Sequence, residues 1–526
     1  MNENEYVFGA NILENLTTGM YQDSKVIYRE YIQNACDQID KAVELGIMKS
    51  ANEGKIEIWI SENDRKISIE DNATGIPKEK FEKILANIAD SSKRIGKDKG
   101  FRGIGRLCGL AYCRELIFSS TAPGEDCICI MRCDAQKMRE LLIRNVRGEK
   151  FTAGEVLKEI YHFEYKTEKN ITEEHWFKVE LIDINEENTE LLDTRAVKKY
   201  LSFTAPVQYK NTFSYQSEIY KHAAEIGYKI DEYSIKLNGE DIFKNYGTHF
   251  KTSKGDDDIF GIEFKDFYDD DGNLIMWLWF GLSQFKGIIS KESVMRGMRL
   301  RKGNIQLGNE DTLQKLFNEE KGQHYFIGEL FAISPELIPN SQRDYFNENE
   351  TRSWFEGKIT KYFKETLYKT YRKASETNSA VRKIEEYNKK VEEHQEKIEQ
   401  NNYIDANHIA HAEENIHIAE QKAKEAQEKI DKLKKYASNS QESTVLTSVI
   451  ERIVNGREKT LTSPEKNVSV KKGSKNKSQT PKRTDKLSRC SKQERKLLGK
   501  VFNIIMNSTD EETAEMIIRN IEEEFK

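Results

Sequence analysis

The chain has 526 residues, which is enough for about three domains, and charged residues make up 33% of it. Its 83 Lys and Arg residues against 89 Asp and Glu residues give a net charge of −6, which excludes a uniformly basic nucleic-acid coat protein. The longest apolar run, residues 274–282, is far shorter than the ~20 residues of a membrane span, so we expect a buried strand there and no membrane contact. An acidic start without an apolar core indicates no secretion signal, and seven cysteines favour reduced thiols in the cytoplasm.

Two stretches of mixed strand and helix patterns come first in the chain. Residues 1–185 alternate short apolar strands with helical segments, and a glycine-rich patch lies near their middle. Residues 186–375 show the same mixture with strands of different sequence. Both stretches are typical of α+β domains.

A third stretch, residues 376–437, lacks Gly and Pro and carries apolar residues at heptad spacing. This spacing predicts a coiled coil. The second half of the seam is four residues out of phase with the first, and the sequence QNNYIDAN lies between them. Either the coil has a stutter there or the chain turns back as a helical hairpin. We favour the hairpin, because consecutive Asn residues and Asp405 suit a turn and a helix cap.

The C-terminal part changes composition again. Residues 438–488 are rich in Ser, Lys, Thr and Asn and predict a low-complexity basic linker, with one short helix at VLTSVIERIV, residues 445–454. Within it, residues 466–489 hold nine Lys and Arg and one Asp. Such a segment favours nucleic-acid contact, although a solvated linker has the same composition. Residues 489–526 are amphipathic and predict a small helical segment.

The first of three polar motifs is REYIQNACDQIDK, residues 29–41. At about 100° per residue, Glu30, Asn34 and Asp37 fall on one face of a helix. An ordinary amphipathic helix with a solvated face shows the same pattern. The functional interpretation is a pocket wall in which a carboxylate orients a water molecule and an amide oxygen ligates Mg²⁺.

The second motif, SIEDNATGI at residues 68–76, is a strand that ends in an acidic turn with glycine. A plain hairpin turn is one interpretation. The functional one is that Asp71 accepts a hydrogen bond from an exocyclic amine, while the small residues before Gly75 let a purine ring pack against the backbone.

The third motif, KGFRGIGRL at residues 99–107, places three glycines ahead of an apolar helical stretch. Backbone N–H groups of such a loop can cradle phosphates at a helix N-terminus, although a structural loop also uses glycine. The polar run that precedes it, residues 89–99, is typical of a mobile lid.

Together and in this order, the three motifs resemble the GHKL superfamily of ATPases, which includes the ninety-kilodalton heat-shock chaperones and the MutL mismatch-repair proteins. No G-x-x-x-x-G-K-[ST] sequence is present, so a P-loop enzyme is excluded. The resemblance covers about residues 8–370. It implies a Bergerat-type α/β sandwich that binds ATP at residues 1–185, a transducer (middle) domain at residues 186–375, and Mg²⁺ as the cofactor of ATP.

The resemblance also implies roles for single residues. Glu30 matches the general base that orients the attacking water, Asn34 the Mg²⁺ ligand, and Asp71 the aspartate that binds adenine. Ala73 stands where the family usually has glycine, and its late Gly-Thr pair has no counterpart here. The remaining nucleotide contacts that the resemblance implies are Asp37, Gly75, Ile76, Asn87, Ser92, Lys93, Gly100, Phe101, Arg102, Gly103, Ile104 and Gly105.

In the second domain, residues 326–346 resemble the chaperone's middle-domain loop, whose arginine reaches the γ-phosphate. Arg343 matches that arginine, so the resemblance implies that this domain supplies positive charge when ATP is bound. A surface arginine paired with Asp344 or Glu348 is the alternative. A nearby basic cluster faces either phosphate, an acidic partner, or solvent at a strand edge: Arg296, Arg299, Arg301 and Lys302.

The expected function is an ATP-hydrolysing molecular clamp of the heat-shock-chaperone or MORC type. A GHKL head followed by a transducer and a coiled coil is similar to the MORC family and its prokaryotic relatives. The resemblance implies a homodimer formed through ATP-bound heads and the coiled coil, with a client protein or DNA as partner. An ATP-gated scaffold that does not hydrolyse ATP, in a setting such as bacterial antiphage defence, is the alternative.

Overall fold

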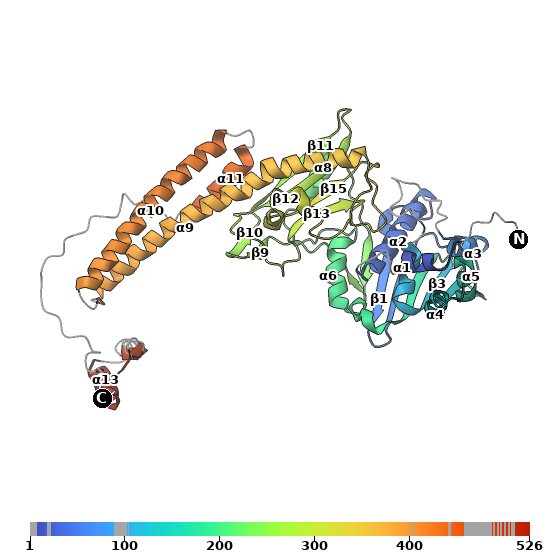
Figure 1. Ribbon diagram of the computed structural model, residues 1–526, viewed down its shortest axis with the longest axis horizontal. Coiled ribbons are helices and arrows are strands. Elements are labelled where there is room, and N and C mark those ends of the chain that lie inside the picture. The colour runs from blue at the N-terminus through green and yellow to red at the C-terminus, as the bar shows by residue number, and fades with distance from the viewer. Residues whose placement is uncertain are drawn as a thin grey trace. The chain divides into compact units, whose positions relative to one another are not determined.

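The computed structural model describes residues 8–17, 23–88, 103, 105–400, 402–403, 406–439, 443–456 and parts of 487–525. The chain forms two compact units, residues 1–464 and 465–526. The first unit contains three sheets, of eight, five and two strands, and a long helical region (Figure 1). The fold is therefore mixed α+β, as the sequence predicts.

The first sheet has eight strands in the order β5-β4-β3-β6-β2-β1-β7-β8. Along β1, Ile56 and Ile58 are fully buried while Trp59 is half exposed, so one face of the sheet carries the core. The strands are β1 (Lys55–Ser61), β2 (Lys66–Asp71), β3 (Cys113–Thr121), β4 (Cys127–Asp134), β5 (Tyr161–Thr167), β6 (Trp176–Ile184), β7 (Ser234–Leu237) and β8 (Glu240–Asp241). The boundary at residue 185 stays a prediction, and the sheet itself continues beyond it into β7 and β8.

Helices pack on the apolar face of this sheet and share one core with it. They are α1 (Asn11–Thr17), α2 (Val26–Glu44), α3 (Lys78–Ala86), α4 (Ala135–Val146) and α5 (Ala153–Ile160), with the 3-10 helices η1 (Ala51–Glu53) and η2 (Gly105–Ala111). The long helix α2 has no Gly or Pro inside it, and Gly46, with φ of +72°, follows its end. A left-handed glycine at this place is a common way to end a helix.

The second sheet has five strands in the order β11-β12-β15-β13-β14. The apolar run at 274–282 is its strand β12, which confirms the predicted buried strand. Trp277 and Trp279 enter the core on one face of this strand, and Leu278 and Phe280 enter the core on the other. A strand buried on both faces has no polar alternation, which explains the continuous apolar sequence.

The remaining elements of this region surround the second sheet or lead to it. Its strands are β11 (Gly261–Tyr268), β12 (Leu274–Leu282), β13 (Gly297–Lys302), β14 (Ile305–Gln306) and β15 (Ile327–Ala332). The others are η3 (Glu186–Leu191), α6 (Thr194–Thr204), α7 (Gln216–Glu225), β9 (His249–Thr252), β10 (Gly255–Asp258), η4 (Gln314–Leu316), η5 (Glu320–Tyr325), α8 (Glu350–Tyr362) and η6 (Phe363–Leu367).

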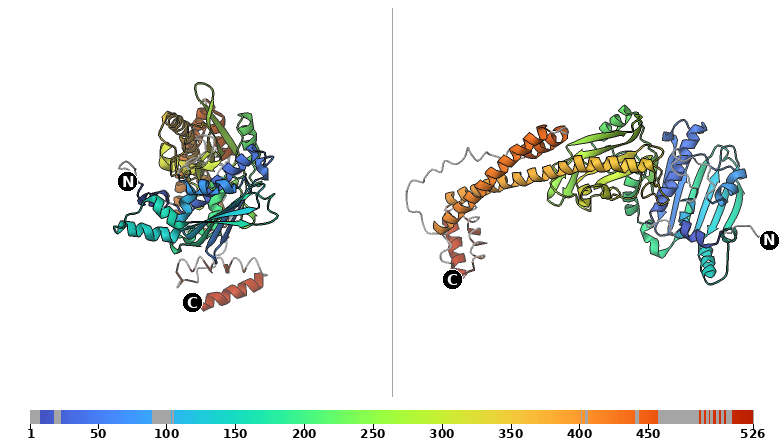
Figure 2. Two further views of the ribbon diagram at one scale, coloured as in Figure 1. Left: turned by 90° about the vertical axis from the view of Figure 1, so that its right-hand side faces the viewer. Right: turned by 45° about the horizontal axis from the view of Figure 1, so that its top comes forward.

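Two long helices, α9 (Tyr368–Glu399) and α10 (Ala406–Asn439), follow and lie side by side (Figures 1 and 2). Lys429 Nζ of α10 is 3.5 Å from Glu376 Oε2 near the start of α9. Near the other end of α9, the His394 ring contacts the hydroxyl of Tyr403, which lies between the two helices. This arrangement is that of a helical hairpin. Its description as a coiled coil stays a prediction.

A third helix, α11 (Ser443–Asn455), packs against this pair and confirms the helix predicted at 445–454. The basic stretch at 466–489 lies almost entirely outside the described residues. In the second unit, α13 (Glu511–Glu524) contributes Ile518 to a small apolar cluster with Leu487 and Phe502. Among the helices that the structure describes, none is long and apolar enough to cross a membrane.

Candidate functional site

The polar stripe of α2 faces the protein interior. Glu30 and Asp37 are each only 5% exposed, and Asn34 is half-buried. An ordinary solvated helix face leaves its carboxylates in water, because burying a charge without partners is costly. The burial of this stripe therefore favours the wall of a binding or catalytic pocket over a solvated helix face.

Glu30 lies against the end of the glycine motif. A Cβ atom placed on Gly105 would be 2.5 Å from Glu30 Oε2, so the carboxylate occupies the space that a side chain would need. The position of Gly105 is set by α2 itself, because Tyr31 OH donates to Arg106 O over 3.0 Å and accepts from Gly109 N–H over 3.2 Å. The first and third motifs are thus in direct contact.

Arg343 reaches the same carboxylate from the second sheet region. Its Nε atom is 3.3 Å from Glu30 Oε1, and the arginine is 9% exposed. The alternative partner Asp344 accepts a hydrogen bond from Asn340 Nδ2. The structure therefore brings Glu30 and Arg343 together, although 312 residues of sequence lie between them.

Arg29 is a site residue that the sequence reasoning missed. Its Nη2 atom is 3.5 Å from Glu30 Oε1 and donates to Gln342 O over 3.1 Å, while Nη1 donates to Arg343 O over 3.4 Å. Arg29 of α2 thus contacts both the Glu30 carboxylate and the backbone of the loop that carries Arg343. The signal was an Arg-Glu pair inside the otherwise apolar run VIYREYI, where a solvated charge pair is unexpected.

Asp71 ends β2 and is 5% exposed. Burial raises the pKa of its carboxyl from 3.8 to about 7, the Ala73 N–H that donates to Oδ1 over 3.0 Å opposes this rise, and the charge of Glu70 adds to it. The carboxyl is therefore a buried acceptor whose charge is only partly compensated by its protein neighbours.

The turn after Asp71 is tightly fixed between α2 and β3. Thr74 Oγ1 donates to Gln38 Oε1 over 2.9 Å, and Ile76 N–H donates to Ser120 Oγ over 2.8 Å. Gly75 has φ of +60°, and a Cβ atom there would lie 1.8 Å from Thr121 O, so only glycine fits.

One departure from the family pattern, Ala73 in place of glycine, lies in this turn. Ala73 is fully buried and is not among the residues with positive φ, so alanine adopts this backbone without strain. His175, just before β6, places Nδ1 at 2.5 Å from Ala73 O. Thr121 Oγ1 is buried and has no hydrogen-bond partner among the residues that the structure describes. A buried polar atom of this kind fits a site that a ligand or its water completes.

Some of the other predicted site residues lie in the described part of the chain, and the rest lie outside it. Asn87 follows α3, and its carbonyl accepts from Arg106 of η2. Gly103 has φ of +70°, and Ile76 packs against the core of the first sheet. The predicted residues that lie outside the described part of the chain are Ser92, Lys93, Gly100, Phe101, Arg102 and Ile104.

Part of the chain is similar to known proteins. Residues 25–164 match the family model described as "Histidine kinase-, DNA gyrase B-, and HSP90-like ATPase". The chain is similar to the chaperone protein HtpG of Fusobacterium nucleatum, at 24% identity over 143 residues, 23% of this chain and 24% of that protein. It is also similar to HtpG of Rickettsia canadensis, at 25% identity over 162 residues, 28% of this chain and 26% of that protein. The matches span about a quarter of each relative's length.

Proposed function

We propose, on the premise that residues 25–164 are an ATPase domain of the histidine kinase, gyrase and HSP90 type, that the protein is a Mg²⁺-dependent ATPase that works as a molecular clamp. The observation that carries the proposal is the 3.3 Å ion pair between Glu30 of α2 and Arg343 of the second sheet region. It supports a reaction centre to which both regions contribute, so that ATP binding and hydrolysis change how they engage.

Adenine binds at the Asp71 end of the site. The ionised carboxylate accepts a hydrogen bond from the exocyclic amine at the turn that leads to Gly75, where Thr121 O of β3 fills the space that a side chain would need. Thr121 Oγ1, buried without a described partner, supplies one further polar group beside that turn. Since a buried carboxylate gains most from a donor, adenine binding lowers the pKa of Asp71 and is favoured above pH 7.

The triphosphate extends along the polar stripe of α2 toward Gly105. The residue that would hold Mg²⁺ is Asn34, through its amide oxygen, because Mg²⁺ prefers oxygen ligands and keeps several waters. Bound there, Mg²⁺ would neutralise charge on the phosphates. Asp37, one turn further along α2, orders the polar groups around this position.

Arg343 and Glu30 exchange partners during turnover. Without nucleotide, the arginine and the carboxylate pair with each other, and Arg29 adds a second positive charge at 3.5 Å from Glu30 Oε1. When a γ-phosphate is present, the Arg343 guanidinium binds its oxygens, because phosphate carries more negative charge than a carboxylate. Glu30 then accepts a proton from the attacking water, and Arg343 stabilises charge on the phosphoryl group.

Phosphate release measured under saturating Mg-ATP tests this assignment. Glu30→Gln should keep ATP binding and lower kcat by about 100-fold or more, which is the usual contribution of a general base. Arg343→Ala should lower kcat by a similar factor, since arginines in this role contribute about 10³-fold or more. Arg144→Ala is the matched control, because Arg144 is an exposed arginine at the end of α4 that pairs with Glu149. Unchanged turnover in Glu30→Gln would remove Glu30 from the reaction.

The larger assembly follows from the same proposal. ATP-bound heads pair, the α9–α10 hairpin joins the two protomers, and the closed clamp holds a client protein or DNA. Size-exclusion chromatography with light scattering, with and without a non-hydrolysable ATP analogue, tests the pairing. A monomer under both conditions contradicts it. Tight ATP binding by the unmodified chain without turnover would instead favour the non-hydrolysing scaffold.

A further inference from the structure

A chain of hydrogen bonds, each buried or partly buried, runs from β13 to the backbone of Arg343. Arg299 Nη1 donates to Gln306 Oε1 over 2.8 Å, and Gln306 Nε2 donates to Gly308 O over 3.2 Å. Gly308 N–H then donates to Arg343 O over 2.9 Å. Arg299 is 5% exposed and Gln306 3%, so water competes little for these bonds.

The backbone at Arg343 needs such support. Its φ of 54° lies in the left-handed region, which is unfavourable for a non-glycine residue and persists only where the surroundings enforce it. Gly308 comes so close to this loop that a Cβ atom on it would lie 2.7 Å from Asp344 O. Arg343 O therefore has two donors, Gly308 N–H from the second sheet region and Arg29 Nη1 from α2.

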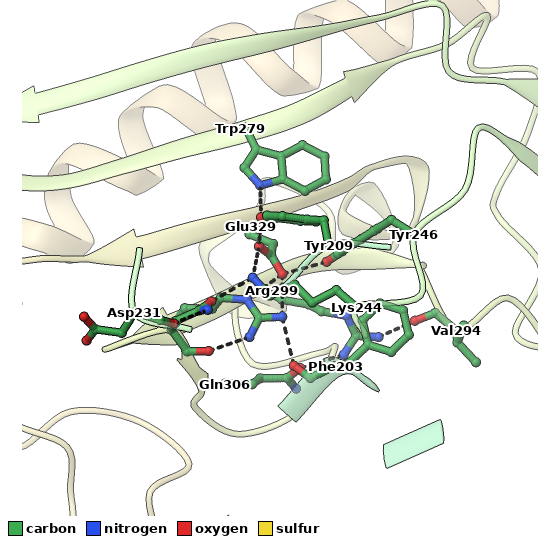
Figure 3. A network of polar contacts seen from close by, with 12 residues as sticks. Phe203, Tyr209, Asp231, Lys244, Tyr246, Trp279, Val294, Arg299, Gln306 and Glu329 are labelled. Carbon is green, nitrogen blue, oxygen red and sulfur yellow. Dashed lines mark hydrogen bonds and ion pairs between the residues drawn. The ribbon is translucent and has the colours of Figure 1, made fainter. Parts of the chain in front are cut away.

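The strand that carries Arg299 is itself anchored by a buried charge network (Figure 3). In the parallel register of β13 on β15, Arg299 is paired with Glu329. The Glu329 carboxylate accepts from Lys244 Nζ and Tyr246 OH over 3.0 Å each, and from Arg301 and Tyr209. Burial alone would disfavour its charge, but Arg301 and Lys244 lower the pKa of Glu329 to about 2.

Arg299 and Arg301 also contact helix α6. Arg301 Nη2 donates to Phe203 O over 2.9 Å, and the Arg299 guanidinium lies over the Phe203 ring at 4.3 Å. Helix α6 in turn contacts α2, the helix that carries Glu30. Arg299 is thus in contact with α6 on one side and is linked, through Gln306, to the loop that carries Arg343 on the other.

We propose that Arg299 and Gln306 are positioning residues that set the reach of Arg343 by fixing its backbone through Gly308. The inference rests on the role of Arg343 proposed above. Neither side chain touches nucleotide. Both act through the hydrogen-bonded backbone of the loop, so their loss moves the Arg343 guanidinium without altering the adenine end of the site.

Two substitutions of Gln306 separate its two hydrogen bonds. Gln306→Leu removes both bonds at similar size. Gln306→Glu keeps an acceptor for Arg299 but has no N–H to donate to Gly308 O. Both variants should lower kcat by about tenfold or more, because misplacement of a reacting group by about 1 Å can cost 100-fold. The dissociation constant of Mg-ATP, from calorimetry, should stay within about twofold, since the adenine contacts are untouched.

Hydrogen exchange gives a second measurement that does not depend on turnover. The amide of Gly308, which donates to Arg343 O, should exchange at least about tenfold faster in Gln306→Leu than in the unmodified protein. Asn378→Leu is the control for general loss of stability. Asn378 is buried in α9, and its Nδ2 donates to Gln284 O over 2.6 Å and to Ala374 O over 3.0 Å. It should leave both kcat and Gly308 exchange unchanged.

Three outcomes overturn the inference. Turnover by Gln306→Leu equal to that of the unmodified protein, while Arg343→Ala is impaired, leaves the proposed function intact and removes Gln306 from it. An equal loss of turnover in Asn378→Leu assigns the effect to stability. Unchanged exchange at Gly308 shows that the backbone link does not depend on Gln306. If the unmodified chain does not hydrolyse ATP, the function proposed for Arg343 fails, and the exchange experiment still decides whether Gln306 fixes the loop.

Discussion

Replacing Asp71 by Asn should stabilise the nucleotide-free protein more at pH 8 than at pH 4. The carboxyl ends β2 in a buried position, and burial raises its pKa in the folded protein from 3.8 to about 7. Between these two values the folded protein holds a proton that the unfolded chain has released. The unfolding free energy of the unmodified protein therefore falls as pH rises from about 4 to about 7, and above that range this contribution to stability is lost.

The size of the effect follows from the two pKa values. Each pKa unit corresponds to about 1.4 kcal/mol, so the difference between 3.8 and about 7 corresponds to about 4 kcal/mol. An amide does not titrate, and its oxygen can still accept from Ala73 N–H. The advantage of Asp71→Asn should thus grow by up to about 4 kcal/mol between pH 4 and pH 8, added to any constant cost of the unpaired amide N–H₂.

Urea unfolding followed by circular dichroism at pH 4, 5, 6, 7 and 8 measures this difference. Asp64→Asn is the control for a simple change of charge, because Asp64 is exposed in the turn between β1 and β2 and accepts from Ser61 Oγ. A stability difference between Asp71→Asn and the unmodified protein that is flat across this range would refute the reasoning. So would a difference that is largest at pH 4.

Three further substitutions probe other parts of the structure. Gly105→Ala places a Cβ atom 2.5 Å from Glu30 Oε2 and should lower kcat for ATP by about tenfold or more with the circular dichroism spectrum unchanged; equal turnover would contradict the contact. Lys244→Met removes one cation from the fully buried Glu329 and should lower the unfolding free energy by about 3–5 kcal/mol in urea titrations; a loss below about 1 kcal/mol would contradict the network. Val449→Asp buries a carboxylate where α11 meets the hairpin, so α11 should become sensitive to limited proteolysis; unchanged resistance would show that this packing is weak.

Local sequence patterns were enough to predict a helix or strand wherever a single segment determines its own structure. The polar stripe of α2, the strand at 274–282 and the short helix at 445–454 each follow from periodicity or apolar length alone. The contact between Glu30 and Arg343 does not, because residues 313 positions apart share no spacing pattern. Only the likeness of residues 326–346 to a known loop indicated that contact, and the Arg-Glu pair within the apolar run VIYREYI was the one sign of the second contact, made by Arg29.

The basic cluster around β13 shows why burial is hard to predict from charge. The sequence left three interpretations open for Arg299 and Arg301: a phosphate site, an acidic partner or a solvated strand edge. The solvated edge is wrong, because the two residues are 5% and 0% exposed and the Glu329 carboxylate lies beside them. The pairing depends on the parallel register of β13 on β15, two strands separated by 24 residues of chain. The charges in the sequence thus indicated a solvent-exposed surface. In the structure, pairing between strands that are distant in the sequence buries these residues in the core.

Isothermal titration of Mg-ATP into the purified full chain tests the central claim most directly, because every assignment depends on a nucleotide between α2 and the turn at Gly75. The account predicts saturable binding at one site per chain at pH 8, weaker binding at pH 6, and loss of that binding in Asp71→Asn. No heat of binding at either pH, under conditions where the protein is folded, would contradict it.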